Sequence, residues 1–187
     1  MNGNQIIEPQ HSTATLSVRV FTPADAEAYH VVRLRALHEQ PPAFGSLPED
    51  EPNLSKTAAR LAESDDRCFF GAFQDEQIIA IVRLSRYSAQ NEKHRAYIAG
   101  LYVVPPFRRN GFGRALVRRA LSRAANTPSI RRVNLTVVTQ QEAAIRLYQS
   151  LGFSIYGTEQ ETFSRDGQFY DEYLMTLELN SENDRNA

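Results

Sequence analysis

The sequence has few of the residues that build disulfides or metal sites. Its 187 residues include one cysteine, Cys68, so an intrachain disulfide is excluded. Neither Cys68 nor the 4 histidines form a cluster with metal-ligand spacing, so we expect no bound metal. Cys68 belongs to an apolar run with the two phenylalanines that follow it, which favours a buried structural role over a nucleophilic one.

Long apolar runs and an excess of one charge are also missing. No segment approaches the roughly 20 apolar residues that a membrane-spanning helix needs. The polar residues 1–15 lack the basic-then-apolar order of a signal peptide. The net charge of −1 argues against a broadly basic nucleic-acid-binding protein. We therefore expect a cytoplasmic protein whose partners include neither membrane nor nucleic acid.

The pattern of apolar, capping and turn residues is typical of one α/β domain. Period-two alternation and turn residues predict strands near residues 16–21, 67–73, 78–86, 97–104, 133–138, 153–161 and 169–179. Helical spacing and caps predict helices near residues 22–40, 54–64, 112–126 and 141–151. The domain should span residues 16–179 around a mixed sheet, with flexible tails at 1–15 and 180–187.

One strand-to-helix connection carries the clearest chemical signal. The predicted strand that ends near residue 104 leads through two prolines into Arg108, Arg109 and Gly111, and Gly113 opens the next helix. The first N–H groups of a helix lack intrahelical acceptors, and glycines let an anion approach the backbone closely. A turn whose glycines only relieve backbone strain is the alternative. Two other phosphate-binding motifs are excluded, because no Gly-Lys-Ser/Thr is present and Leu116 replaces the third glycine of a dinucleotide fingerprint.

Two motifs together resemble the GNAT family of N-acetyltransferases. Arg108, Gly111 and Gly113 match the family's Arg/Gln-x-x-Gly-x-Gly/Ala motif between a strand and a helix. Residues 144–153 are similar to the family's last helix and its Leu-Tyr…Gly-Phe signature. The resemblance covers residues 16–179. It implies one α+β domain with a mostly antiparallel sheet of six or seven strands, four helices, and a gap between the fourth and fifth strands.

The resemblance implies that acetyl-CoA is the cosubstrate and lies across this gap. Its pantetheine arm would pair with the backbone of the fourth strand, as an added strand does. Its pyrophosphate would accept hydrogen bonds from the loop amides. The implied contacts are Leu101, Tyr102, Val103, Arg108, Arg109, Asn110, Gly111, Phe112, Gly113, Arg114 and Gln141. Gln141 stands where many relatives have an asparagine.

The resemblance also implies direct acetyl transfer from the thioester to an amine. The N–H of Val103 would stabilise the thioester oxygen, and the Tyr148 hydroxyl would protonate the leaving thiolate. A core tyrosine is the alternative reading of Tyr148. Many relatives carry a glutamate in the strand before the loop, and this strand has no carboxylate. The base therefore stays open between a water relay with Tyr97, His94 and Glu92.

The acceptor pocket of similar proteins lies between the first two helices and the last hairpin. The resemblance implies the acceptor contacts Phe44, Gly45, Arg83, Tyr97 and Tyr170. The end of the chain resembles acetyltransferases that act on free amino acids, so a small primary amine, with amino acids preferred, is the first expectation. Acetylation of a protein N-terminus or a lysine is the second, and a CoA-binding module without catalysis is the third. A homodimer through edge strands is compatible with all three.

Overall fold

The computed structural model describes residues 16–39 and 43–179, which form a single seven-stranded sheet flanked by helices. The strands are β1 (Leu16–Val20), β2 (Arg67–Gln74), β3 (Gln77–Arg86), β4 (Arg95–Val103), β5 (Arg132–Val138), β6 (Ser154–Arg165) and β7 (Gln168–Glu178). The α-helices are α1 (Ala26–Glu39), α2 (Leu54–Leu61), α3 (Phe112–Ala125) and α4 (Glu142–Gln149). The predicted tails at 1–15 and 180–187 lie outside the described residues.

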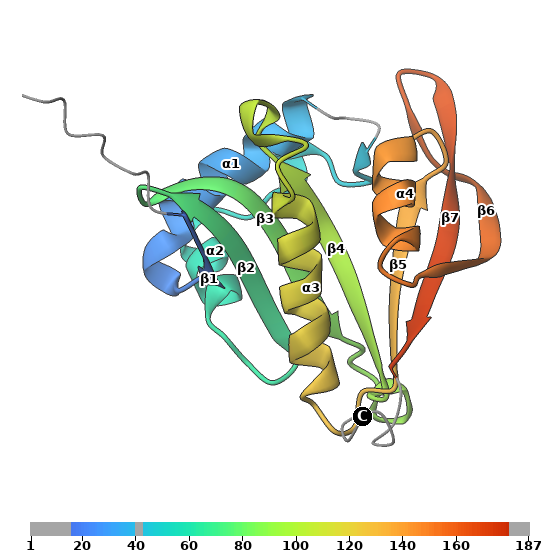
Figure 1. The fold of residues 1–187 in the computed structure, drawn as a ribbon. Coiled ribbons are helices and arrows are strands. Elements are labelled where there is room, and N and C mark those ends of the chain that lie inside the picture. The colour runs from blue at the N-terminus through green and yellow to red at the C-terminus, as the bar shows by residue number, and fades with distance from the viewer. Residues whose placement is uncertain (1–15, 40–42, 180–187) are drawn as a thin grey trace, which may run out of the picture.

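The helices cover both faces of the sheet (Figure 1). On one face, α3 buries Leu116, Val117 and Ala120 in a core that also receives Tyr148 from α4. On the other face, α1 and α2 enclose a second apolar cluster around Phe21. Among the described residues, no helix is long and apolar enough to cross a membrane.

Local signals fix several helix ends. The side chain of Asn53 accepts a hydrogen bond from the N–H of Lys56 at 3.0 Å and so caps the start of α2. Gly152, with φ 94°, adopts the left-handed conformation shortly after α4. The predicted strands and helices are confirmed, with bounds that differ by a few residues; β6 differs most. β6 continues to Arg165 through a register shift between Glu159 and Phe163, and this irregularity breaks the alternation that marks a strand in sequence.

The strand order is β1-β2-β3-β4-β5-β7-β6, and β4 and β5 form the only parallel pair among the described strands. They pair at just three positions, Arg95↔Arg132, Ala96↔Val133 and Tyr97↔Asn134. Beyond Tyr97 they diverge, as the V shape of these strands in Figure 1 shows. The gap predicted between the fourth and fifth strands is therefore confirmed.

A bulge in β4 lies beside this divergence. Ile81 pairs with Tyr102 and Arg83 pairs with Ala99, so β4 contains one residue more than β3 over this stretch. Gly100 has φ 67°, a left-handed conformation that glycine adopts without a Cβ clash. Because a bulge bends and twists its strand, it helps to turn the second half of β4 away from β5.

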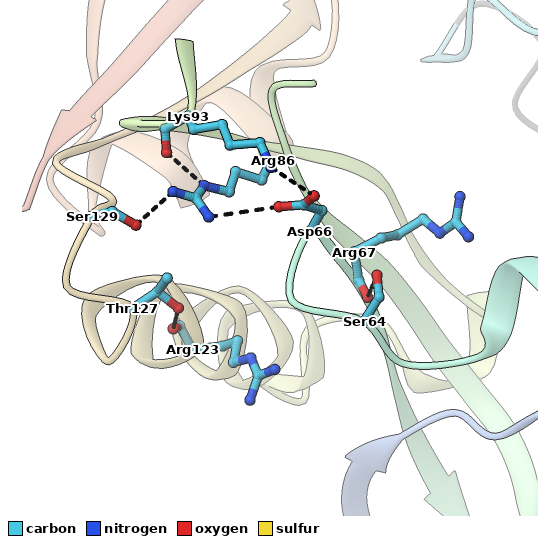
Figure 2. Close-up of polar contacts among 8 residues, drawn as sticks. All are labelled: Ser64, Asp66, Arg67, Arg86, Lys93, Arg123, Thr127 and Ser129. Carbon is cyan, nitrogen blue, oxygen red and sulfur yellow. Dashed lines mark hydrogen bonds and ion pairs between the residues drawn. The ribbon is translucent and has the colours of Figure 1, made fainter. Parts of the chain in front are cut away.

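The closed end of the V is held by a polar cluster around Arg86 (Figure 2). The Nε of Arg86 donates to the carbonyl of Lys93 at 2.6 Å, and its Nη2 donates to the hydroxyl of Ser129 at 2.6 Å. Asp66 lies 3.6 Å from Nη1 of Arg86 and 3.3 Å from Nζ of Lys93. The cluster joins the loops that precede β2, β4 and β5, so the sheet is tied at one end and open at the other.

Candidate active site

Unpaired backbone amides gather in the loop between β4 and α3. Arg109 and Gly111 have φ angles of 64° and 83°, in the left-handed region. The first helical bond of α3 runs from the N–H of Ala115 to the carbonyl of Gly111 at 2.9 Å. The N–H groups of residues 109–114 consequently meet no acceptor in the part of the chain that the structure describes. Such a loop at a helix N-terminus can bind an anion.

The two glycines of the loop have different surroundings. A Cβ on Gly111 would meet no atom within 4 Å, so the space beside it is open. A Cβ on Gly113 would lie 3.5 Å from Cδ2 of Leu147, 3.6 Å from Cγ2 of Val103 and 3.9 Å from Cδ2 of Leu101. The loop therefore packs against β4 and α4 at one glycine and opens to solvent at the other.

The backbone of Val103 points into the gap. The N–H of Val104 donates to the carbonyl of Ile79 at 2.9 Å, and Val103 faces Ala80 across the two strands. In this type of antiparallel pair, the N–H and C=O of Val103 point away from β3. Its carbonyl accepts a hydrogen bond from Nε of Arg108 at 2.9 Å, so the N–H is the group left for a ligand.

The other predicted contacts on β4 divide between its two sides. Leu101 lies two residues before Val103 and shares its side of the strand. The Tyr102 side chain is buried on the opposite face, where its hydroxyl donates to Oε2 of Glu39 on α1. Burial, together with this hydrogen bond, raises the pKa of Tyr102 to about 12. The structure thus brings Leu101 and Val103 to the loop, and directs the Tyr102 side chain elsewhere.

Two predicted residues of α4 lie beside the opening. Tyr148 is 7% exposed and packs edge-on against Phe153, and its hydroxyl makes no hydrogen bond to a described residue. Burial raises the pKa of its hydroxyl, and nearby Tyr97 raises it further. Tyr148 therefore keeps its proton near neutral pH and can give it only to a basic group. Gln141 forms the N-cap of α4, with its side chain half-buried and its carbonyl accepting from Ala144.

Arg114 links the two helices that border the loop. Its Nη2 donates to the hydroxyl of Ser150 at 2.8 Å, and that hydroxyl donates to the carbonyl of Leu147 at 2.6 Å. Its positive charge is thus held beside the unpaired amides. Asn110 and Phe112 complete the loop, with Asn110 exposed and the Phe112 ring 6.4 Å from that of Phe107.

A cavity of about 390 Å³ lies on the α1 and α2 side of the diverging strands. Four of the five predicted acceptor contacts line it: Phe44, Gly45, Arg83 and Tyr97. The fifth, Tyr170, does not. Its ring stacks on Phe163 at 5.2 Å within the β6–β7 hairpin, and its hydroxyl donates to Gln168.

Glu172 on β7 also lines this cavity, and the sequence does not single it out. It is half-buried, and burial raises the pKa of its carboxyl against the opposing effect of a hydrogen bond from Thr136. Thr136 is in turn bound to Tyr97, whose hydroxyl donates to its Oγ1 at 2.8 Å and accepts from its N–H at 3.0 Å. The hydrogen-bonded pair of Tyr97 and Thr136 therefore lies at the start of the gap and lines the same cavity as Glu172.

The structure places the two other base candidates away from this cavity. His94 and Glu92 precede β4 at its closed end, whereas Val103 is the last residue of that strand. The nine residues of β4 separate the two ends by about 30 Å. His94 lines a different depression, together with Arg131.

Comparisons with known proteins agree with this arrangement. The family model described as the acetyltransferase (GNAT) family matches residues 32–153. The L-amino acid N-acetyltransferase AaaT of Escherichia coli strain K12 is 26% identical over 153 residues, which cover 80% of this chain and 93% of that protein. A GNAT-family acetyltransferase from Streptococcus pneumoniae has a TM-score of 0.82 at 26% identity, covering 88% of this chain and 99% of that one. The fold is shared with yncA, a putative acetyltransferase from Salmonella typhimurium solved with its cofactor acetyl-CoA, at a TM-score of 0.77 and 20% identity over 89% of this chain and 95% of that one.

Proposed function

Because this chain belongs to the acetyltransferase (GNAT) family and is an acyltransferase, we propose that it transfers an acetyl group from acetyl-CoA to a primary amine. The acceptor in this proposal is a small molecule, and amino acids are the first class to test. One observation carries the proposal. The unpaired amides of residues 109–114 lie against the strand whose Val103 N–H points into the gap.

The described residues fit acetyl-CoA. The amides of residues 109–114 would bind its pyrophosphate, aided by the charges of Arg109 and Arg114. The free edge of β4 at Leu101 and Val103 would pair with the pantetheine amides. Gly113 packs beside both residues, so the loop follows this edge of β4 closely. The relative crystallised with acetyl-CoA shares this fold.

Residues at the site can supply the general base and the general acid that acetyl transfer needs. The amine nitrogen bonds to the acetyl carbon while the carbon–sulfur bond breaks. Before this step, Glu172 takes one proton from the ammonium, directly or through water, because only the neutral amine has a lone pair. The N–H of Val103 would donate to the acetyl oxygen as it gains charge. Tyr148 gives its proton to the sulfur, and the second proton leaving nitrogen restores it.

The covered acceptor cavity favours a small molecule over a peptide. Nη2 of Arg165, on the β6–β7 hairpin, donates to the carbonyl of Ser46 at 3.2 Å and to that of Phe44 at 3.5 Å. A Cβ on Gly45 would lie 3.9 Å from the Phe163 ring. These contacts bring the 43–46 loop against the hairpin, across the place where a peptide would need an open groove.

Transfer can be measured directly. The purified protein is incubated with acetyl-CoA and either a panel of free amino acids and amines or a panel of peptides. CoA release is followed by thiol titration, and products are identified by mass. We expect acetylated small amines. Acetylation confined to peptides would contradict the small-molecule assignment, and binding of acetyl-CoA without any transfer would indicate a non-catalytic module.

A further inference from the structure

Building on the proposed acetyl transfer, we infer that the acceptor carries an anionic group, a carboxylate or a phosphate, which Arg83 and Arg33 bind on the β3 side of the cavity. The two side chains come from β3 and α1, and both line the cavity. Each has a buried guanidinium nitrogen that meets no acceptor among the described residues.

The side chain of Arg83 makes no hydrogen bond or ion pair with any described residue. It is half-buried, its Nε is shielded from solvent, and that Nε lacks an acceptor. Burial lowers the pKa of its guanidinium, and the charges of Arg60 and Arg33 lower it further. A buried cation without a partner costs free energy, and an anion bound beside it would remove that cost.

Arg33 contributes a second unused donor. The residue is 9% exposed, and its Nε donates to Oε1 of Glu51 at 2.9 Å. Its Nη1 is buried without an acceptor and lies 3.9 Å from the position that a Cβ on Gly100 would take. The free donor therefore sits against the bulge of β4, next to the proposed reaction site.

Among the described residues, the carboxylates of the cavity leave Arg83 Nε and Arg33 Nη1 without an acceptor. Glu51 is already shared between Arg33 and Arg60, at 2.9 and 3.9 Å. Asp50 is exposed, and its Oδ2 accepts from the N–H of Leu47. The guanidinium of Arg83, on the β3 side of the cavity, therefore has no anionic partner among the described residues.

Glu172 supplies the opposite charge on the far side of the gap. It lies on β7, two strands beyond β4, whereas Arg83 lies on the neighbour of β4 on the other side. An acceptor with an ammonium and an anionic group would be oriented by these two charges, with its amine toward Glu172. A neutral amine would leave Arg83 unpaired, so the cavity should select against it.

Matched acceptors test this inference. L-phenylalanine is compared with phenethylamine and with 1-amino-2-phenylethylphosphonate, and L-methionine with 3-(methylthio)propylamine. We expect the anionic members to be acetylated with a kcat/KM roughly ten- to hundred-fold above that of their neutral partners, the scale of a charge-assisted hydrogen bond. The carboxylate and phosphonate arms tell which anion is preferred.

Variants of the anion site give the second arm. Arg83→Gln should raise the KM for the anionic acceptors roughly ten- to hundred-fold. It should leave the KM for acetyl-CoA unchanged, and the rate with phenethylamine should not fall, because the neutral amine loses no partner when Arg83 is removed. Arg83→Lys, which keeps the charge without the guanidinium fork, should fall in between. Arg119→Gln removes an equal charge from the exposed face of α3 and is the matched control.

The outcomes separate this inference from the proposed function. Equal rates with amino acids and their decarboxylated partners, or equal losses of both in Arg83→Gln, would overturn the anion site while acetyl transfer stands. If Arg83→Gln unfolds, the Arg83→Lys variant and the acceptor series with the native protein still test whether the anion site exists. Acetylation of no amine at all would remove the proposed function itself.

Discussion

At the residue scale, Tyr148 combines burial with a hydroxyl that has no partner among the described residues. A core tyrosine usually has a hydrogen-bond partner. The unpaired Tyr148 hydroxyl at the edge of the core is therefore available to hydrogen-bond an atom of a ligand. The pKa of Tyr148 is raised by burial. The raised pKa keeps the hydroxyl protonated and makes it a weak acid, so it gives up its proton only as negative charge develops on the leaving sulfur.

Tyr148→Phe should bind acetyl-CoA normally, because only the hydroxyl is lost and the ring keeps its packing against Phe153. Turnover should fall by roughly 10²–10⁴-fold, the scale of acid–base catalysis. Pre-steady-state CoA release measures the chemical step, and titration calorimetry measures binding. An unchanged chemical step would return Tyr148 to the role of a core residue.

Glu172 can take a proton from the acceptor only when its side chain is ionised. Because burial raises its pKa above the usual value, the rate should fall as the pH drops through this raised pKa. Glu172→Gln should abolish that acid limb and lower kcat by roughly 10²–10⁴-fold. The measurement is a pH profile of kcat with an amino acid acceptor.

Glu178→Gln is the matched control, because Glu178 lies on the same strand and pairs with exposed Arg132 at the closed end. Its profile should match that of the native protein. An acid limb that persists in Glu172→Gln would assign that ionisation to another group.

The contrast between these two residues shows what the sequence could predict. Tyr148 belongs to a contiguous motif, so the resemblance marked it. Glu172 lies among alternating residues of a strand, and its role depends on β5 and the 43–46 loop meeting it in space. Tyr170 was expected in the cavity and does not line it. It lies two residues from Glu172 on β7, beyond the last pairing of that strand with β5, and its ring stacks on Phe163.

At the element scale, the start of α3 is the proposed binding site of the cosubstrate. Its elements were predictable, since glycines, prolines and apolar spacing mark the strand, the loop and the helix within one short stretch of sequence. The direction of the Val103 N–H was implied only by the resemblance. It depends on hydrogen bonds between β3 and β4, which join residues distant in the chain.

Gly111→Glu should abolish acetyl-CoA binding, because a carboxylate would occupy the open space beside the amides and repel the pyrophosphate. Titration calorimetry gives the affinity. Gly167→Glu is a matched control, since Gly167 also has a left-handed φ of 78° and a Cβ there would likewise meet no atom within 4 Å. Both variants carry the same backbone strain, so an equal loss of affinity in both would assign the effect to strain rather than to the site.

At the scale of the whole molecule, the proposed function depends on a sheet that is tied at one end and open at the other. The sequence pattern alone predicted a mixed sheet, and the gap itself came from the family resemblance. The Arg86 cluster was not predictable, because its members Asp66, Lys93 and Ser129 lie in three separate loops that only the fold brings together.

Arg86→Met should lower the free energy of unfolding by about 1–3 kcal/mol, because it removes charge-assisted hydrogen bonds from a half-buried site. Its effect on acetyl-CoA affinity should be negligible, since the cluster lies at the closed end. Urea denaturation measures the stability. Arg67→Met is the control, because the Arg67 side chain points away from the cluster in Figure 2, and its cost should stay within about 0.5 kcal/mol. A similar loss of unfolding free energy in both variants would contradict the stabilising role of the Arg86 cluster.

The most direct test of the account is an amide NMR titration of the native protein with acetyl-CoA. The account predicts that the backbone N–H resonances of Val103 and residues 109–114 shift together and saturate at one equivalent, because these are the amides without acceptors. Binding that moves other resonances and leaves these in place would contradict it.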